Sequence, residues 1–210
     1  MKTAQPVIAP FETRQSKRQN VLAIAGSLRH GSYNRLLLAN AKALAPEHLE
    51  IEQYDALGSI PLFDEDLEQR TGGGPDAVRS LRGLVASADG LLISTPEYNQ
   101  SMSGVLKNVI DWLSRAGPDE VLIGKPIAIM GASGGRWGTR LAQANLRQVL
   151  TATESLVMHQ PAVFVAEAAR LFDEDGKLSH ELTRGQLKNL LLAFARWLEL
   201  MQTPRPMGVQ

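Results

Sequence analysis

Three short, continuous apolar segments constrain the fold of this chain most strongly. They are VLAIAG at 21–26, GLLIST at 90–95 and PIAIMGA at 126–132, and each ends in small or turn-forming residues. Such segments are typical of strands buried on both faces, as in a parallel sheet. Two weaker candidates are HLEIEQY at 48–54, whose alternation suits an edge strand, and LVMH at 156–159. The sequence therefore predicts a five-stranded parallel sheet.

Segments with helical periodicity separate these strands. Apolar residues recur at helical spacing within 32–44, 103–116, 138–150 and 179–200, and Ser32 is the predicted N-cap of the first helix. Alternating strands and helices imply right-handed βαβ units, with helices on both faces of the sheet. The size suits a flavodoxin-like three-layer α/β sandwich with strand order 2-1-3-4-5, rather than a full dinucleotide-binding domain.

The domain organisation follows from these segments. One domain is predicted over residues 20–202, preceded by a flexible extension over 1–19 and followed by a tail over 203–210. The extension lacks the hydrophobic core of a signal peptide, and no segment approaches the roughly 18–20 apolar residues of a membrane span. We therefore expect a cytoplasmic protein with no membrane partner, and a basic transit peptide is the alternative reading of the extension.

Composition excludes several kinds of chemistry. The chain has no cysteine, which excludes disulfides, thiolate zinc sites, cysteine-ligated clusters and cysteine nucleophiles. Its 22 basic and 22 acidic residues give no net charge, which disfavours a nucleic-acid partner. The four histidines lie on different predicted elements, and the acidic run at 64–68 is interpreted as a solvated loop closed by glycines 72–74. No metal site is predicted.

The loop after the first strand, GSLRHGSYN at 26–34, leads directly into a helix. The free backbone N–H groups and the dipole of a helix start both favour an anion. Ser27, Ser32 and Asn34 add neutral donors, and Arg29 adds a guanidinium suited to phosphate oxygens. The pattern predicts a phosphate site, and a capped helix start with an exposed arginine is the alternative.

Two better-known phosphate motifs do not fit this loop. The dinucleotide fingerprint G-x-G-x-x-G fails because Leu28 stands where the second glycine belongs. Gly26 and Gly31 have the spacing of a P-loop, but Ser32 takes the place of its lysine. Hydrolysis of a nucleoside triphosphate is therefore disfavoured.

The loop after the third strand reads PEYNQSMSG at 96–104. Pro96 restricts the backbone, and Asn99 and Gly104 tolerate turn conformations. The loop can present backbone amides and the Tyr98 ring at the strand ends. This arrangement suits a flat heteroaromatic ligand with polar edges.

Taken together, the motifs G-S-L-R-x-x-S-x-N and P-E-Y-N-x-S-x-x-G-x-L-K-N-x-I-D-W resemble those of the NAD(P)H-dependent FMN reductase family. Members of that family include quinone, chromate and azo-dye reductases. The resemblance extends over residues 20–150, including IPLFDEDLE at 60–68 and ASGG at 132–135. The chain departs from the family at Ser103, where proline is usual, and we expect this serine to loosen the start of the helix without removing a flavin contact.

The resemblance implies bound FMN, with NADPH or NADH as co-substrate. By position, it assigns the FMN phosphate to Ser27, Arg29, Ser32 and Asn34. It assigns the isoalloxazine ring and ribityl chain to Pro96, Glu97, Tyr98 and Asn99, and the remainder of the ring site to Ser133, Gly134 and Gly135. No side chain is assigned as catalytic, because the hydride chemistry takes place at FMN N5. Arg136 and Trp137 could contact either the dinucleotide or a neighbouring subunit.

The implied function is hydride transfer from NAD(P)H through FMN to a small acceptor such as a quinone, free flavin, azo compound or chromate, by a homodimer or homotetramer. A flavodoxin-like electron carrier is an alternative, but such carriers are typically acidic and this chain has no net charge. Two further alternatives are a non-enzymatic flavin-binding module and a receiver-like regulatory module. A receiver needs an aspartate at the end of the third strand, where this chain has Thr95, Pro96 and Glu97. The motifs leave open both the acceptor and the choice between NADH and NADPH.

Overall fold

A parallel sheet forms the centre of the structure, a computed structural model that describes residues 17–115 and 120–202. Its strands are β1 (Gln19–Ala25), β2 (Leu49–Tyr54), β3 (Gly90–Ser94), β4 (Pro126–Ala132), β5 (Leu156–Val157) and β6 (Val163–Val165). They are ordered β2-β1-β3-β4-β5, β6 also pairs with β4, and every pairing is parallel. The predicted parallel sheet and its order 2-1-3-4-5 are confirmed, with β2 at an edge.

The fifth position of the sheet is shared by two short strands. β5 pairs with Pro126 and Ile127 of β4, whereas β6 pairs with the stretch from Met130 to Ala132. The predicted single strand at 156–159 therefore stops early, and β6 was not predicted. Pro161 lies between the two strands, and it has no backbone N–H with which to continue the ladder.

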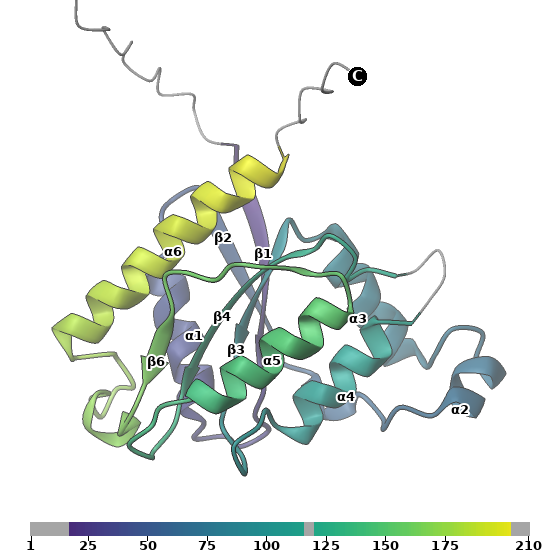
Figure 1. Cartoon of the computed structure of the whole chain (residues 1–210), viewed down its shortest axis with the longest axis horizontal. Helices are drawn as coiled ribbons and strands as arrows, with labels where there is room; N and C mark the ends of the chain where they lie inside the picture. The colour runs from purple at the N-terminus through teal and green to yellow at the C-terminus, as the bar shows by residue number, and fades with distance from the viewer. Residues whose placement is uncertain (1–16, 116–119, 203–210) are drawn as a thin grey trace, which may run out of the picture.

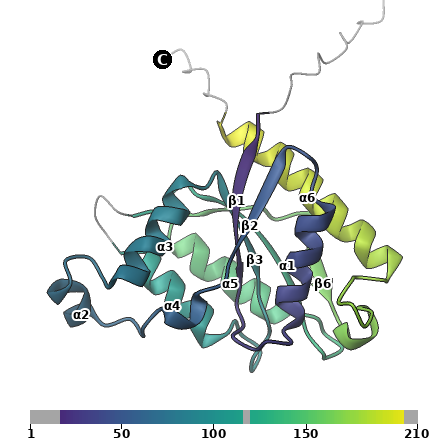
Figure 2. The same cartoon turned by 180° about the vertical axis from the view of Figure 1, so that it is seen from behind.

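Helices flank the sheet on both sides (Figures 1 and 2). They are α1 (Tyr33–Leu44), α2 (Glu65–Arg70), α3 (Asp76–Ser87), α4 (Gly104–Leu113), α5 (Arg140–Ala152) and α6 (Glu181–Gln202), with 3-10 turns η1 (Leu57–Ser59) and η2 (Ala168–Arg170). The four predicted helices are present, and Ser32 caps α1 as predicted, by accepting a hydrogen bond from the Asn34 backbone N–H. Helices α2 and α3 are additional.

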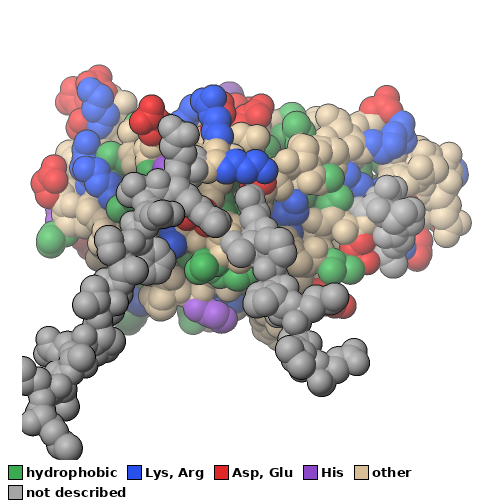
Figure 3. All heavy atoms as spheres, turned by 90° about the horizontal axis from the view of Figure 1, so that it is seen from above, with side chains coloured by type: hydrophobic (Ala, Val, Ile, Leu, Met, Phe, Trp, Pro, Cys, Tyr) green, Lys and Arg blue, Asp and Glu red, His purple; other side chains and the backbone are tan. Residues whose placement is uncertain are grey.

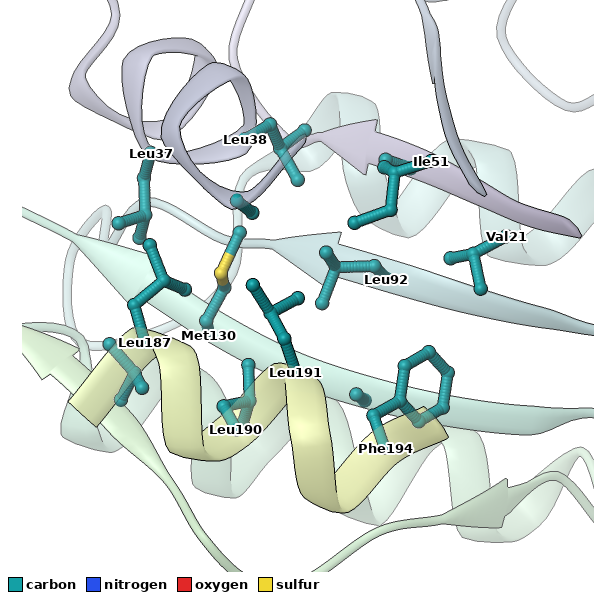
Figure 4. Packing of buried hydrophobic residues seen from close by; sticks show 14 of the residues in the cluster. Val21, Leu37, Leu38, Ile51, Leu92, Met130, Leu187, Leu190, Leu191 and Phe194 are labelled. Carbon is teal, nitrogen blue, oxygen red and sulfur yellow. The ribbon is translucent and has the colours of Figure 1, made fainter. Parts of the chain in front are cut away.

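Two buried apolar clusters, one on each face of the sheet, form the core. α1 and α6 pack on one face, where Leu37, Leu92, Met130 and Leu191 meet (Figure 4). α3, α4 and α5 supply the other cluster, which contains the fully buried Trp112. Because β1, β3 and β4 send side chains into both clusters, their apolar residues are continuous rather than alternating.

The acidic run at 64–68 is not the solvated loop that was predicted. Residues 65–68 belong to α2, which projects away from the sheet (Figure 1). Asp64 is its N-cap, and the Asp64 carboxylate accepts a hydrogen bond from the Asp66 backbone N–H at 2.9 Å. Glu68 pairs with Arg82 at 3.3 Å and with Arg115 at 2.8 Å, and the hydrogen bond to Glu68 raises the pKa of the Arg115 guanidinium. Acidic residues favour the positive end of a helix, and here one of them also anchors the helix to the domain.

The segment that leads into α2 is held by α4. The Pro61 carbonyl accepts from Asn108 Nδ2 and from Trp112 Nε1, both at 2.8 Å, and the Phe63 backbone N–H donates to Asn108 Oδ1 at 2.7 Å. The asparagine and tryptophan of the L-K-N-x-I-D-W motif are therefore structural anchors.

The first strand begins one residue before the predicted start of the domain at residue 20. Gln19, which the prediction placed in the N-terminal extension, is the first residue of β1, and its Nε2 donates to the Ala195 carbonyl at 2.9 Å. Residues 1–16 of that extension and the predicted tail at 203–210 lie outside the described residues. Within residues 17–115 and 120–202, no helix is long and apolar enough to cross a membrane. Seen from above, basic and acidic side chains are interspersed on the surface at the amino ends of the strands (Figure 3).

Candidate functional site

The three predicted site loops lie side by side at the carboxyl edge of the sheet, the lower edge in Figure 1. The Gly26 backbone N–H donates to the Ser94 carbonyl at 2.9 Å, and the Thr95 N–H donates to the Met130 carbonyl at 3.0 Å. These bonds extend the pairing of β1, β3 and β4 into the loops that follow them. Ligands of parallel α/β sheets bind at this edge, at the point where the strand order reverses.

Asn34 joins the ends of three elements. Its Nδ2 donates to the Ala132 carbonyl, and its Oδ1 accepts from the Ala132 N–H and from Ser94 Oγ, each at 2.9 Å. The side chain is buried, so these bonds link α1 to the ends of β3 and β4 away from water. The Asn34 side chain therefore holds the ends of β3 and β4 in place and makes its hydrogen bonds to the protein itself.

The start of α1 offers free donors. In the described part of the chain, the backbone N–H groups of His30, Gly31 and Tyr33 donate no hydrogen bond. Ser27 is buried beside them, and from the described residues its Oγ accepts one long hydrogen bond of 3.4 Å, from the Arg29 N–H. The Arg29 guanidinium lies 5.4 Å from the Tyr33 ring centroid and has no carboxylate partner among the described residues. This donor set, with one unpaired cation, fits a phosphate group.

The loop after β3 is a tight two-residue turn. Tyr98 and Ser101 exchange backbone hydrogen bonds of 2.9 and 3.0 Å around Asn99 (φ 49°) and Gln100 (φ 65°). Positive φ at both central residues is the geometry of a type I′ turn, which asparagine tolerates well. The turn leaves the Tyr98 ring 52% exposed, while Pro96 at its base is buried.

Glu97 occupies the start of a second helix. Its Oε2 accepts hydrogen bonds from the Leu141 and Ala142 backbone N–H groups, at 2.9 and 3.0 Å. The carboxylate therefore supplies the cap of α5 that Thr139, its N-cap residue, does not provide. The start of α5 already has an internal anion, whereas no carboxylate of the described residues binds the start of α1. Of these two helix starts, α1 is the one that can accept a ligand's phosphate.

The loop after β4 is ordered by Ser133. Its Oγ donates to the Gly138 carbonyl at 2.9 Å and accepts from the Gly135 N–H at 3.2 Å. Gly134 and Gly135 are exposed, and a Cβ added at Gly134 would meet no atom within 4 Å. This loop can therefore expose its backbone to a ligand at close range.

Ser103 does not loosen the helix start, contrary to expectation. Its Oγ accepts from the Leu106 N–H at 3.3 Å as the N-cap of α4, and it donates to the Gly26 carbonyl at 2.6 Å. The serine thus connects the first residue of the α1 loop to the helix that follows the β3 loop. Sequence reasoning missed this role, although serine before an apolar helical stripe is a recognisable N-cap signal.

Between the first two loops lies a pocket of about 300 Å³. It is lined by Ser27, Leu28, Arg29, Tyr98, Ser103, Gly104 and Val105. Phosphate donors lie at one part of its rim, and an aromatic ring with aliphatic side chains lies at another. Of the predicted residues, Ser27, Arg29 and Tyr98 line this pocket. The other predicted residues do not line it: Ser32, Asn34, Pro96, Glu97, Asn99, Ser133, Gly134 and Gly135. The combination fits the phosphate and flat ring of FMN, and no group of three or more potential metal ligands occurs in the described part of the chain.

The fold and this site define the class of protein. A parallel sheet ordered 2-1-3-4-5, with a free helix start where the order reverses, is the arrangement of flavodoxin-like mononucleotide-binding proteins. More particularly, the chain belongs to the NADPH-dependent FMN reductase family, whose family model matches residues 19–170. It is an FMN-dependent oxidoreductase with NAD(P)H as co-substrate, which confirms the resemblance seen in the sequence.

Relatives along the whole domain agree. The chain is 44% identical over 182 residues to an NAD(P)H-dependent FMN reductase from Pseudomonas aeruginosa, covering 87% of this chain and 96% of that one. It is 36% identical over 185 residues to a quinone reductase from Escherichia coli, covering 88% and 97%. Among solved structures, the flavoenzyme FerB from Paracoccus denitrificans, an NAD(P)H:(acceptor) oxidoreductase, superposes with a TM-score of 0.79 at 33% identity, covering 87% and 98%.

Proposed function

We propose that the chain reduces small-molecule acceptors, quinones first among them, at an FMN site formed by the three loops. The observation that carries this proposal is the free start of α1, with Ser27 and Arg29, beside a pocket walled by Tyr98. When bound, FMN supplies the hydride chemistry, and the protein's part is to bind, orient and shield it.

The proposed roles of the predicted residues differ by loop. Ser27, Arg29 and Ser32 hold the phosphate, and Asn34 holds the framework around it. The segment from Pro96 to Asn99 places backbone groups and an aromatic ring beside the flavin, with Glu97 anchoring that segment on α5. The segment from Ser133 to Gly135 completes the ring site through exposed backbone.

Quinones are proposed as acceptors because several relatives carry that activity in their names. Besides the Escherichia coli enzyme, a 2-hydroxy-1,4-benzoquinone reductase from a Burkholderia species is 38% identical over 178 residues, covering 85% of this chain and 95% of that one. The half-exposed Tyr98 ring offers a face on which a flat acceptor can stack. Free flavin, azo compounds and chromate are the other acceptors to compare.

We further propose a cytoplasmic homodimer or homotetramer, with the reductase domain running from β1 to the end of α6. Large apolar side chains are exposed in two of the site loops, Leu28 at 52% and Trp137 at 62%, and in the segment that leads into α2, Leu62 at 82%. Exposed apolar surface of this kind is typical of contact between copies. Size-exclusion chromatography coupled to light scattering measures the molar mass in solution and so distinguishes monomer, dimer and tetramer.

The test of the function uses the purified full-length protein. It should carry FMN or take it up, and it should oxidise NADPH or NADH rapidly when 1,4-benzoquinone is added. Arg29→Ala should weaken FMN binding about tenfold or more, since a hydrogen bond to a charged group is lost. Arg18→Ala is the matched control, because this exposed arginine pairs with Glu50 at the start of the sheet. Protein that is colourless and does not take up FMN would overturn the proposal.

A further inference from the structure

Two arginines, Arg136 on the β4–α5 connection and Arg140 at the first position of α5, have no carboxylate partner among the described residues. Arg136 lies with its guanidinium carbon 4.7 Å from the Trp137 ring centroid, and that of Arg140 lies 4.6 Å from the Phe164 ring centroid. Both arginines are exposed, and neither takes part in any ion pair of the described residues. Stacking on an aromatic ring orients a guanidinium but leaves its charge and its edge N–H groups available.

Two glutamates, Glu97 and Glu167, form hydrogen bonds with the β4–α5 connection or with α5, and the carboxylate of each already has other partners. Glu97 binds the backbone of α5 through its Oε2. Glu167, whose backbone N–H donates to the Gly135 carbonyl, pairs through its carboxylate with Arg170 at 3.0 Å. Neither of these two carboxylates forms an ion pair with Arg136 or Arg140.

The charge of FMN does not account for these two cations. A phosphate monoester carries about two negative charges at neutral pH, and the α1 start with Arg29 already provides for it. Arg136 lies instead on the connection after β4 and Arg140 at the first position of α5, on the other side of the β3 loop. Neither lines the pocket of Ser27 and Arg29. The reaction requires a second phosphate-bearing ligand, the nicotinamide dinucleotide.

We infer that Arg136 and Arg140 bind the phosphate groups of NAD(P)H while its nicotinamide reaches the flavin. This inference rests on the proposed function of the same site. A guanidinium suits phosphate oxygens, and the exposed Trp137 ring beside Arg136 offers a flat surface for a base of the dinucleotide. The phosphate recognised belongs either to the pyrophosphate, which NADH and NADPH share, or to the 2′-phosphate that NADPH alone carries.

The test compares Arg136→Ala, Arg140→Ala and the double variant with wild type, all loaded with FMN. Each single variant should raise the KM for the dinucleotide about tenfold, with kcat and FMN affinity unchanged, because charge-assisted bonds to the substrate are lost. Equal effects on NADH and NADPH identify the pyrophosphate, and an effect on NADPH alone identifies the 2′-phosphate. Arg196→Ala, which removes an exposed arginine on α6, is the matched control and should change none of these values.

A binding measurement makes the test independent of turnover. Isothermal titration calorimetry with NADP⁺ and NAD⁺ should show the same loss of affinity in the variants. Unchanged KM and unchanged binding in the double variant would overturn the inference, as would a change of oligomeric state with no effect on the dinucleotide. Failure of the wild type to bind FMN or oxidise either dinucleotide would instead refute the proposed function, so the two failures are distinguishable.

Discussion

Asn34→Ala should destabilise the protein even when no FMN is present. The substitution removes the partner of the Ala132 carbonyl, the Ala132 N–H and Ser94 Oγ, all of which are buried. A hydrogen bond contributes about 1 kcal/mol net, and a buried group left unpaired costs at least as much. Three such groups predict a loss of about 3 kcal/mol in the free energy of unfolding, and a Tm lower by about 6–12 °C for a domain of this size.

Urea unfolding of apoprotein, followed by circular dichroism, measures this loss. Asn145→Ala is the matched control, because that asparagine accepts a single hydrogen bond, from Ser101 Oγ, and should cost about 1 kcal/mol or less. Ser94→Ala removes one of the three bonds, so the double variant with Asn34→Ala should show coupling of about 1 kcal/mol. If Asn34→Ala lost less than about 1 kcal/mol yet bound FMN poorly, Asn34 would be a ligand of the phosphate, and the framework role would be refuted.

Three further outcomes are expected. Ser103→Ala should cost about 1–2 kcal/mol in urea unfolding, since α4 loses its cap and the Gly26 carbonyl loses a donor; an unchanged midpoint would contradict this role. Glu68→Gln should cost about 2–3 kcal/mol, because it leaves the charge of the buried Arg82 without its carboxylate; a neutral effect would show that Arg82 needs only its carbonyl partners. Burial lowers the pKa of Lys125 below 10.5, so the folded state releases its proton first and folding stability rises as pH increases toward that value. The free energy of unfolding of wild type, relative to that of Lys125→Met, should therefore be larger at pH 10 than at pH 8. An equal difference at the two pH values would count against the lowered pKa.

The sheet could be predicted from the sequence because a strand that is buried on both faces is apolar at consecutive positions. β1 from Val21 onward, β3 and β4 are continuous apolar runs, and the small residues that follow them mark the edge where the site lies. β5 and β6 have two and three residues, too few to carry a period. α3 carried a usable signal, since Val78, Leu81 and Val85 have helical spacing, whereas α2 is a six-residue polar helix with no buried side chain.

The position of the site loops could be predicted for the same reason, but the hydrogen bonds within the site could not. Asn34 binds a residue 98 positions away, Ser103 one 77 positions away, and Glu97 two that lie 44 and 45 positions away. Local patterns identify asparagine, serine and glutamate as polar residues near a ligand. They do not tell a ligand contact from a framework contact, because the partners come together only through the sheet.

The carboxylate of Glu97 also determines which way round a ligand can lie. Three strand–loop–helix units, β1–α1, β3–α4 and β4–α5, face the same edge of the sheet. A phosphate could in principle bind at the start of α1 or of α5, which lie on opposite sides of the β3 loop. With Glu97 on the Leu141 and Ala142 amides, the α1 start is open and the α5 start is not, so phosphate and ring have a single order between these two helices. Glu97→Ala would make the two ends alike, and a mononucleotide would then have two orientations, of which only one leaves its ring beside Tyr98.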